Sequence, residues 1–250
     1  SLYGFGKASG TTASAVYKYD IDGEIRGTTT WSTPANNEGS TTGRGEGVFF
    51  YYKDYLYMWA GGTKLGRFGT LSSGPSFTDA YQSIAHSNVA QPVHHKADDI
   101  AYFFSDNNVH SLNNTSWSSS VLSLPDNLVI ASACEYGNYL AIGCRPKTAS
   151  ASIYSASESS VVYLWDRDSS VTTLSQRIDL GSGRLVALAE LEGSLVALID
   201  YFTNYSFGLT DSKIAIKRIV GTENVTVRNI PTDDPTSTIY GHSGGNYVVS

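Results

Sequence analysis

The chain of 250 residues contains only two cysteines and one methionine, and charged residues make up 16% of it. Two cysteines cannot build the disulfide framework that staples many small secreted domains. No apolar run approaches the roughly 18 residues of a membrane-spanning helix, so no membrane insertion is expected. With a net charge of −6 the chain lacks the basic surface on which phosphate binding depends, and no nucleic-acid partner is expected.

Helical periodicity is also missing, and short apolar segments separated by turn residues take its place. Val48–Tyr52 leads through Lys53 and Asp54 into Tyr55–Ala60, and a third segment, Lys64–Phe68, follows after a glycine pair. Each segment has the length and the aromatic and β-branched content of a strand. The sequence therefore predicts a unit of hairpin, loop and further strand.

This unit recurs about five times along the chain. Its hairpin turns lie near residues 53, 98, 137, 193 and 245, at separations of 39 to 56 residues, close to the period of a propeller blade. Two later copies contain the predicted strands Ile130–Glu135, Tyr139–Cys144, Val161–Trp165, Leu185–Ala189, Leu195–Ile199 and Lys213–Ile216. Because one such unit cannot bury its apolar face alone, we expect an all-β propeller of about five four-stranded blades.

Residues 1–250 are expected to form a single propeller domain. The approximate repeats are 1–44, 45–92, 93–127, 128–182 and 183–236, with a partial repeat at 237–250. The first segment resembles outer strands and the last segment resembles inner strands, so pairing them would close the ring and remove exposed edges. The alternative, that the chain is part of a six- or seven-bladed ring, stays open.

Cys134 and Cys144 flank one predicted hairpin. With a turn at Gly137 and Asn138, Cys134 lies opposite Ala141 and Cys144 lies opposite Ala131, so that the sulfurs are offset by three positions. A disulfide would need another register. Both cysteines are therefore predicted to be free thiols that pack as small apolar side chains.

Ligands of propellers usually bind where the connections between blades meet the loops that join the second and third strands. We expect polar and charged side chains at the starts and ends of the inner strands to reach this face, where they could hold an anionic or hydroxyl-rich ligand. The candidate ligand-binding residues are Arg44, His94, Asp126, Arg145, Arg184 and Asp200.

Adjacent histidines at 94 and 95, followed by Asp98 and Asp99, suggest a metal site. Neighbouring side chains on a strand point to opposite faces, however, so these two rings cannot easily bind one ion. The chain also lacks the G-x-S-x-G elbow of serine hydrolases and the G-x-x-x-x-G-K-[ST] phosphate loop. We expect no metal, no cofactor and no catalytic residue.

Tyr55, Tyr57 and Trp59 share one face of a predicted strand. Such a row could stack on sugar rings, but packing against the adjacent blade is the favoured explanation. The alternative function is therefore a secreted carbohydrate-binding lectin or a sialidase-like glycoside hydrolase. A hydrolase would need two carboxylates facing the axis, for which Glu46 with Asp126 or Asp200 is the available choice.

Three segments carry a resemblance to a known group of proteins: Leu124–Asn127, Tyr136–Gly143 and Val162–Asp166. Together they resemble propeller proteins of tailed bacteriophages and related environmental viral genomes, over about residues 93 to 220. The resemblance implies a virion component on the tail or capsid surface, used for assembly or host attachment. Its motifs are structural, and it transfers no active-site residue.

The sequence thus predicts a non-enzymatic binding or structural module. Its expected location is virion or extracellular, and its expected partners are other virion proteins or a host-surface receptor or glycan. A homo-oligomer within an assembly is compatible with this expectation.

Overall fold

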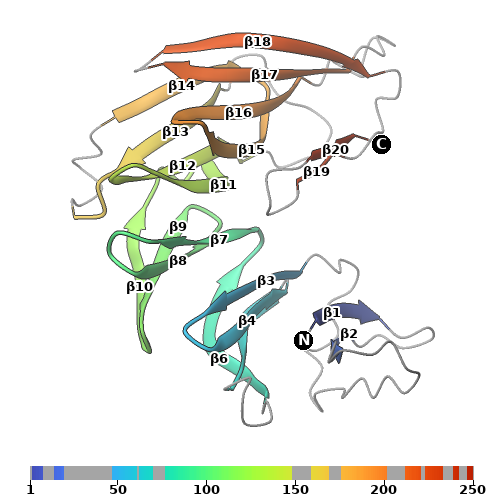
Figure 1. Ribbon diagram of the computed structural model, residues 1–250, viewed down its shortest axis with the longest axis vertical. Coiled ribbons are helices and arrows are strands. Elements are labelled where there is room, and N and C mark those ends of the chain that lie inside the picture. Colours follow the sequence, from blue (N-terminus) through green and yellow to red (C-terminus); the bar gives the residue numbers. More distant parts are fainter. Residues whose placement is uncertain are drawn as a thin grey trace. The chain divides into compact units, whose positions relative to one another are not determined.

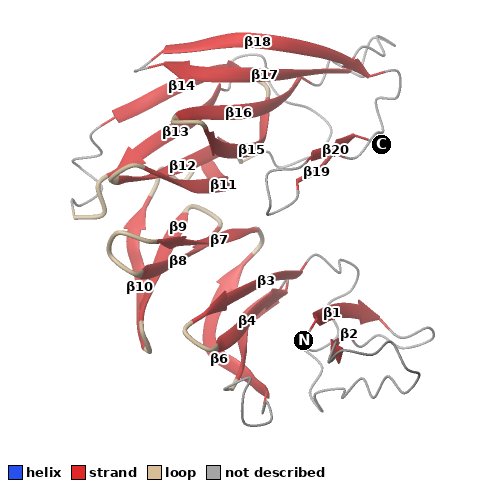
Figure 2. Ribbon diagram, in the orientation of Figure 1, coloured by secondary structure: helices blue, strands red, loops and turns tan. Residues whose placement is uncertain are grey.

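A computed structural model describes the chain in segments. The described residues are 2–7, 14–19, 47–60, 62–69, 77–147, 159–168, 176–201, 212–220, 223–232, 239–241 and 247–249. Every regular element in them is a β-strand (Figure 2). The chain divides into two compact units, Ser1–Val89 and Ala90–Ser250, and each is described by itself.

The first unit contains one antiparallel strand pair and one four-stranded antiparallel sheet whose strands follow chain order (Figure 1). The turn between its β3 and β4 places Lys53 and Asp54 at φ values of 48° and 68°. Two consecutive left-handed residues make the tight hairpin turn that suits the twist of the strands. The strands are β1 (Leu2–Lys7), β2 (Ser14–Tyr19), β3 (Gly47–Tyr52), β4 (Tyr55–Ala60), β5 (Gly62–Phe68) and β6 (Phe77–His86).

The second unit contains three sheets of four antiparallel strands, again in chain order, and one further strand pair. The first sheet consists of β7 (Val89–His95), β8 (Ile100–Ser105), β9 (Asn108–Asn113) and β10 (Ser116–Ser123). The second consists of β11 (Leu128–Tyr136), β12 (Tyr139–Pro146), β13 (Ser159–Trp165) and β14 (Gln176–Ser182). The third consists of β15 (Arg184–Leu191), β16 (Ser194–Tyr201), β17 (Ser212–Val220) and β18 (Glu223–Thr232), and the pair is β19 (Ile239–Gly241) with β20 (Tyr247–Val249).

Four complete four-stranded antiparallel sheets in chain order are the blades of a β-propeller. The predicted fold class, an all-β propeller of about five four-stranded blades, is confirmed. Two expectations stay predictions: that the terminal strand pairs close a ring, and that residues 1–250 form a single domain.

Strand β12 explains how the blades of the second unit pack. Leu140 and Ile142 point into a core shared with β8 of the preceding blade, whereas Ala141 points into a core shared with Leu185 and Leu188 of the following blade. A strand buried on both faces needs an almost continuous apolar sequence, which is why this segment shows no alternation.

Two serines, the buried Ser160 and the partly buried Ser132, connect the second and third blades. The Ser160 hydroxyl donates to the Gly183 carbonyl at 2.7 Å and accepts from the Leu185 amide at 3.0 Å. The Ser132 hydroxyl makes the same double contact with the carbonyl and amide of Leu188, at 3.3 and 3.0 Å. Each hydroxyl thereby satisfies two backbone groups that the blade interface removes from water.

Both cysteines are free, as predicted. The register places Cys134 opposite Ala141, but Cys144 lies opposite Ile130 rather than Ala131. The predicted partner was wrong because the register of β11 shifts between Ile130 and Ser132, where one residue bulges out of the ladder. Burial raises the pKa of the Cys134 thiol to about 12 and also raises the pKa of the Cys144 thiol.

Candidate functional site

Asp126 lies where the sequence predicts it, in the connection between the first and second blades of the second unit. The Asn107 side chain in the β8–β9 turn donates to the Leu124 carbonyl at 2.6 Å and to the Asp126 carboxylate at 3.1 Å. The Ile130 amide donates to the Asp106 carbonyl at 2.7 Å. The connection between blades and the turn between second and third strands therefore meet at one face.

Arg145 and Lys147 reach the same end of the second blade. Arg145 pairs with Val129 at the end of β12, and the Lys147 amide donates to the Asn127 carbonyl at 2.7 Å. Backbone hydrogen bonds thus hold the inter-blade connection from both sides. We call this face, defined by Asp126, Arg145, Arg184 and Asp200, the connection face.

Arg184 and Asp200 form the corresponding end of the third blade. They are register partners at the start of β15 and the end of β16. Burial raises the pKa of the Asp200 carboxyl to about 6, and the Arg184 guanidinium acts in the opposite direction. A carboxyl that exchanges its proton near neutral pH can either donate or accept a hydrogen bond from a ligand.

The two remaining candidates of the sequence are Arg44 and His94. Arg44 lies outside the described residues, as does Glu46. His94 was expected at the start of an inner strand, but β7 begins at Val89 and ends at His95, so His94 lies at the other end of its blade. The placement was wrong because the third repeat begins four residues earlier than the sequence predicts.

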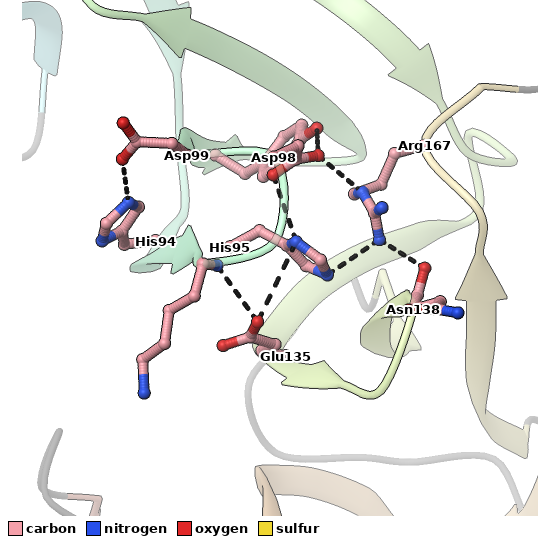
Figure 3. A network of polar contacts seen from close by, with 9 residues as sticks. His94, His95, Asp98, Asp99, Glu135, Asn138 and Arg167 are labelled. Atoms are coloured by element: carbon pink, nitrogen blue, oxygen red, sulfur yellow. Dashed lines mark hydrogen bonds and ion pairs between the residues drawn. The ribbon is translucent and has the colours of Figure 1, made fainter.

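That other end holds a network of charged side chains, which Figure 3 shows from close by. His95, completely buried, lies with Nδ1 at 3.1 Å from Asp98 Oδ1 and 3.9 Å from Glu135 Oε1. Arg167 donates from Nε to Asp98 Oδ2 at 2.7 Å, and its Nη1 contacts both His95 Nε2, at 2.7 Å, and the Asn138 carbonyl. We call these side chains, together with Tyr102, the His95 cluster.

Tyr102 completes the His95 cluster. Its hydroxyl donates to Asp98 Oδ2 at 3.2 Å, and its ring packs edge-on against Trp165 with centroids 5.7 Å apart. Burial and the neighbouring Asp98 carboxylate raise the pKa of the Tyr102 hydroxyl, so it stays a donor. Asp166 accepts from the Asp168 amide at 3.1 Å and so shapes the bend that carries Arg167.

The two adjacent histidines have separate partners. His94 is exposed and pairs with Asp99 at 2.8 Å, whereas His95 is buried and faces Asp98. Their opposite directions agree with the expectation that they do not share an ion. Within the described segments, no group of three or more His, Cys, Asp or Glu side chains is arranged to hold a metal.

A further histidine, His110, forms a buried pair with Ser105 that the sequence does not predict. The ring Nε2 lies 2.8 Å from the Ser105 hydroxyl, which is the spacing of a nucleophile and its base. The Ser120 amide, however, donates to Nδ1 at 3.0 Å. The ring proton therefore lies on Nε2 and points at the serine, so this ring cannot take the serine proton.

Most of the aromatic row of β4, formed by Tyr55, Tyr57 and Trp59, is buried. Tyr57 and Trp59 are fully buried, and the Trp59 indole donates to the His86 ring at 2.8 Å. The Arg67 guanidinium lies over the rings of Tyr55 and Tyr81, at 4.6 and 4.1 Å from their centroids. The row packs within the protein and does not offer an open platform for a sugar.

No helix in the described part of the chain is long and apolar enough to cross a bilayer. No protein-family model matches the chain, and no curated protein matches it significantly.

Solved structures do resemble the chain. A structure from work on two prolyl endopeptidases matches 99% of this chain at 12% identity with a TM-score of 0.50. The extracellular domain of a protein described as a one-component system of Bacteroides thetaiotaomicron matches 95% at 13% identity, also with a TM-score of 0.50. A quinoprotein alcohol dehydrogenase-like protein of the same bacterium matches 74% at 14% identity with a TM-score of 0.46.

This chain spans 36%, 29% and 47% of those three chains, in that order. At these identities the likenesses with a TM-score of 0.50 concern the fold alone. The conclusion they support is that the chain is built as an all-β propeller.

Proposed function

We propose that the chain is a non-enzymatic propeller module that binds a partner through the connection face. The observation that carries this proposal is the backbone bonding of the face. Asn127 and Lys147 are joined amide to carbonyl, as are Asp106 and Ile130, so two blades support one inter-blade connection. A face held in this way can present Asp126 and Arg145 to a ligand with little loss of conformational entropy on binding.

The chemistry of the described side chains supports binding without catalysis. The Ser105–His110 pair has the wrong tautomer for a nucleophile and base. Asp98 is neutralised by Arg167, and Glu135 accepts from the Lys96 amide at 3.0 Å. These carboxylates are engaged in structural contacts.

The partner that we propose is a virion protein or a host-surface receptor or glycan, with the chain displayed on a phage tail or capsid. This part rests on the resemblance of residues 93–220 to phage propeller proteins. A virion or extracellular location belongs to the same proposal, as does a homo-oligomer within the assembly.

A secreted lectin or a glycoside hydrolase is the second candidate, and Asp200 is the observation in its favour. Its pKa of about 6 is the property that a general acid needs, and Arg184 lies opposite it. A hydrolase would need a second carboxylate about 5 to 10 Å away to act as nucleophile or base.

An array of bacterial surface polysaccharides and animal glycans tests both candidates, with aryl glycosides added to detect turnover. The double variant Arg145→Ala/Arg184→Ala should lose at least about tenfold in affinity, because two charge-assisted contacts are removed. Arg218→Ala is the matched control, since Arg218 is an exposed arginine of β17 bonded to Ser194. Turnover that Asp200→Asn abolishes would favour the hydrolase and overturn the non-enzymatic proposal.

A further inference from the structure

The protonation state of His95 follows from its contact with Arg167. A guanidinium has only donors, so at a separation of 2.7 Å the Nε2 atom of His95 must accept. The ring of His95 is therefore neutral in this arrangement and carries its proton on Nδ1. That proton faces Asp98 and Glu135 (Figure 3).

The polar atoms on the Nδ1 side are not fully satisfied. Nδ1 of His95 and Oδ1 of Asp98 are both buried, and neither has an aligned hydrogen bond within the described part of the chain. Their separation is nevertheless 3.1 Å, and Glu135 Oε1 lies 3.9 Å from the same nitrogen. The proton on Nδ1 therefore lies near two carboxylates but makes no strong hydrogen bond to either.

The groups of the His95 cluster come from two consecutive blades. Asp98 lies in the β7–β8 turn of one blade, whereas Glu135 and Asn138 belong to the β11–β12 hairpin of the next. Arg167 follows β13 and contacts both blades at once, through Asp98 and through the Asn138 carbonyl. The contact between Arg167 and His95 therefore lies at the junction of the two blades.

We infer that His95 is a proton-operated switch: when its ring takes up a second proton, it releases Nη1 of Arg167. A proton from solvent adds to the lone pair of Nε2, and no covalent bond between heavy atoms changes. The new N–H then points at a guanidinium that also has only donors, with two positive charges in contact. The contact between His95 and Arg167 must break, while the Nδ1 proton remains beside Asp98 and Glu135.

Loss of the His95 contact also affects the contact of Arg167 with the β11–β12 turn. Its Nη1 is the atom shared between His95 and the Asn138 carbonyl, so turning it away from the ring also removes it from the β11–β12 turn. The end of the side chain, which is now 15% exposed, would turn toward solvent while Nε keeps its bond to Asp98. The expected consequence is a looser junction between these two turns at acidic pH, with the blades themselves intact.

Nitrogen-15 NMR of the full chain tests this inference. At about pH 7.5, long-range spectra should assign the proton of His95 to Nδ1, and acidification of the folded protein should place protons on both ring nitrogens. Over the same acidification the order parameter of the Arg167 Nη1–H bonds should fall from a rigid value near 0.85 to below about 0.6, whereas the Nε–H bond, which Asp98 Oδ2 holds, should stay rigid.

Two variants isolate the effect. His95→Gln keeps an acceptor for Arg167 but cannot titrate, so its Arg167 should stay ordered before and after acidification. His94→Gln removes the exposed neighbouring histidine and should behave like the wild type. A proton on Nε2 at about pH 7.5 would overturn the inference. So would an Arg167 side chain that stays ordered when His95 is charged, or one that loosens equally in His95→Gln.

Discussion

Gly143 of β12 lies so close to Leu185 of β15 that a Cβ atom at position 143 would stand 2.3 Å from Leu185 Cδ2. The same Cβ would lie 3.1 Å from the Ser132 carbonyl oxygen. The second and third blades of the second unit therefore approach one another as closely as backbone and side chain allow. A glycine at this position permits that approach.

Gly143→Ala should destabilise the protein by about 1 to 3 kcal/mol, because the added methyl group overpacks the blade interface. Denaturant unfolding monitored by tryptophan fluorescence measures the change. Gly193→Asn is the control: Gly193 has φ +78°, a Cβ atom there would meet nothing within 4 Å, and asparagine tolerates this conformation. The control should change stability by less than about 0.5 kcal/mol, and equal effects of both substitutions would contradict the proposed close packing.

Ser160→Ala should cost about 1 to 3 kcal/mol, since it leaves the buried Leu185 amide and Gly183 carbonyl without their shared partner. Thermal and denaturant unfolding give the value. Ser118→Ala, on an exposed position of β10, serves as the matched control and should be nearly neutral. A neutral Ser160→Ala would mean that the hydroxyl does not bridge the blades.

Asp200 should make the protein less stable as the pH rises. Burial raises the pKa of its carboxyl from 3.8 to about 6, so between these values the folded state binds the proton more tightly than the unfolded chain. Stability therefore falls as the pH increases through this window. Asp200→Asn should raise the Tm by a few degrees at pH 7.5 and change it little at pH 4, and a variant that melts lower at pH 7.5 would refute this sign.

The two thiols should be unreactive in the folded protein. Burial raises the pKa of Cys134 to about 12 and raises that of Cys144 as well, so thiolate is scarce at pH 8. A chromogenic disulfide reagent should label neither thiol of the folded protein and both thiols in denaturant. Any slow labelling of the folded protein should proceed at the rate of global unfolding. Rapid labelling without denaturant, or a disulfide in the untreated protein, would be the contrary result.

Local chemistry explains why much of the fold could be predicted. Hairpin turns at Lys53–Asp54 and Gly137–Asn138 depend on residues within a few positions of each other, and both turns were predicted correctly. The start of β7 was predicted wrongly, because Pro92 lies inside this strand. Proline interrupts a strand pattern, but β7 is an edge strand of its sheet, where a missing amide is tolerated.

The His95 cluster could not be predicted, because it depends on contacts between distant parts of the chain. Arg167 is 69 residues from Asp98 and 72 from His95. In the sequence it stands in a run of Asp and Ser residues that resembles a solvated turn. The close spacing of His95 and Asp98 gave one local signal. Trp165 and Asp166 gave another, since the first packs on Tyr102 and the second shapes the bend that carries Arg167.

The central claim is that consecutive four-stranded sheets pack face to face as propeller blades. A double-mutant cycle between Gly143→Ala and Leu185→Ala tests it most directly. Removing the Leu185 side chain vacates the space that the methyl group added by Gly143→Ala needs, so the cost of that substitution should fall by at least about 1 kcal/mol in the Leu185→Ala background. The same cost in both backgrounds would contradict the account, because the two residues would then not share a blade interface.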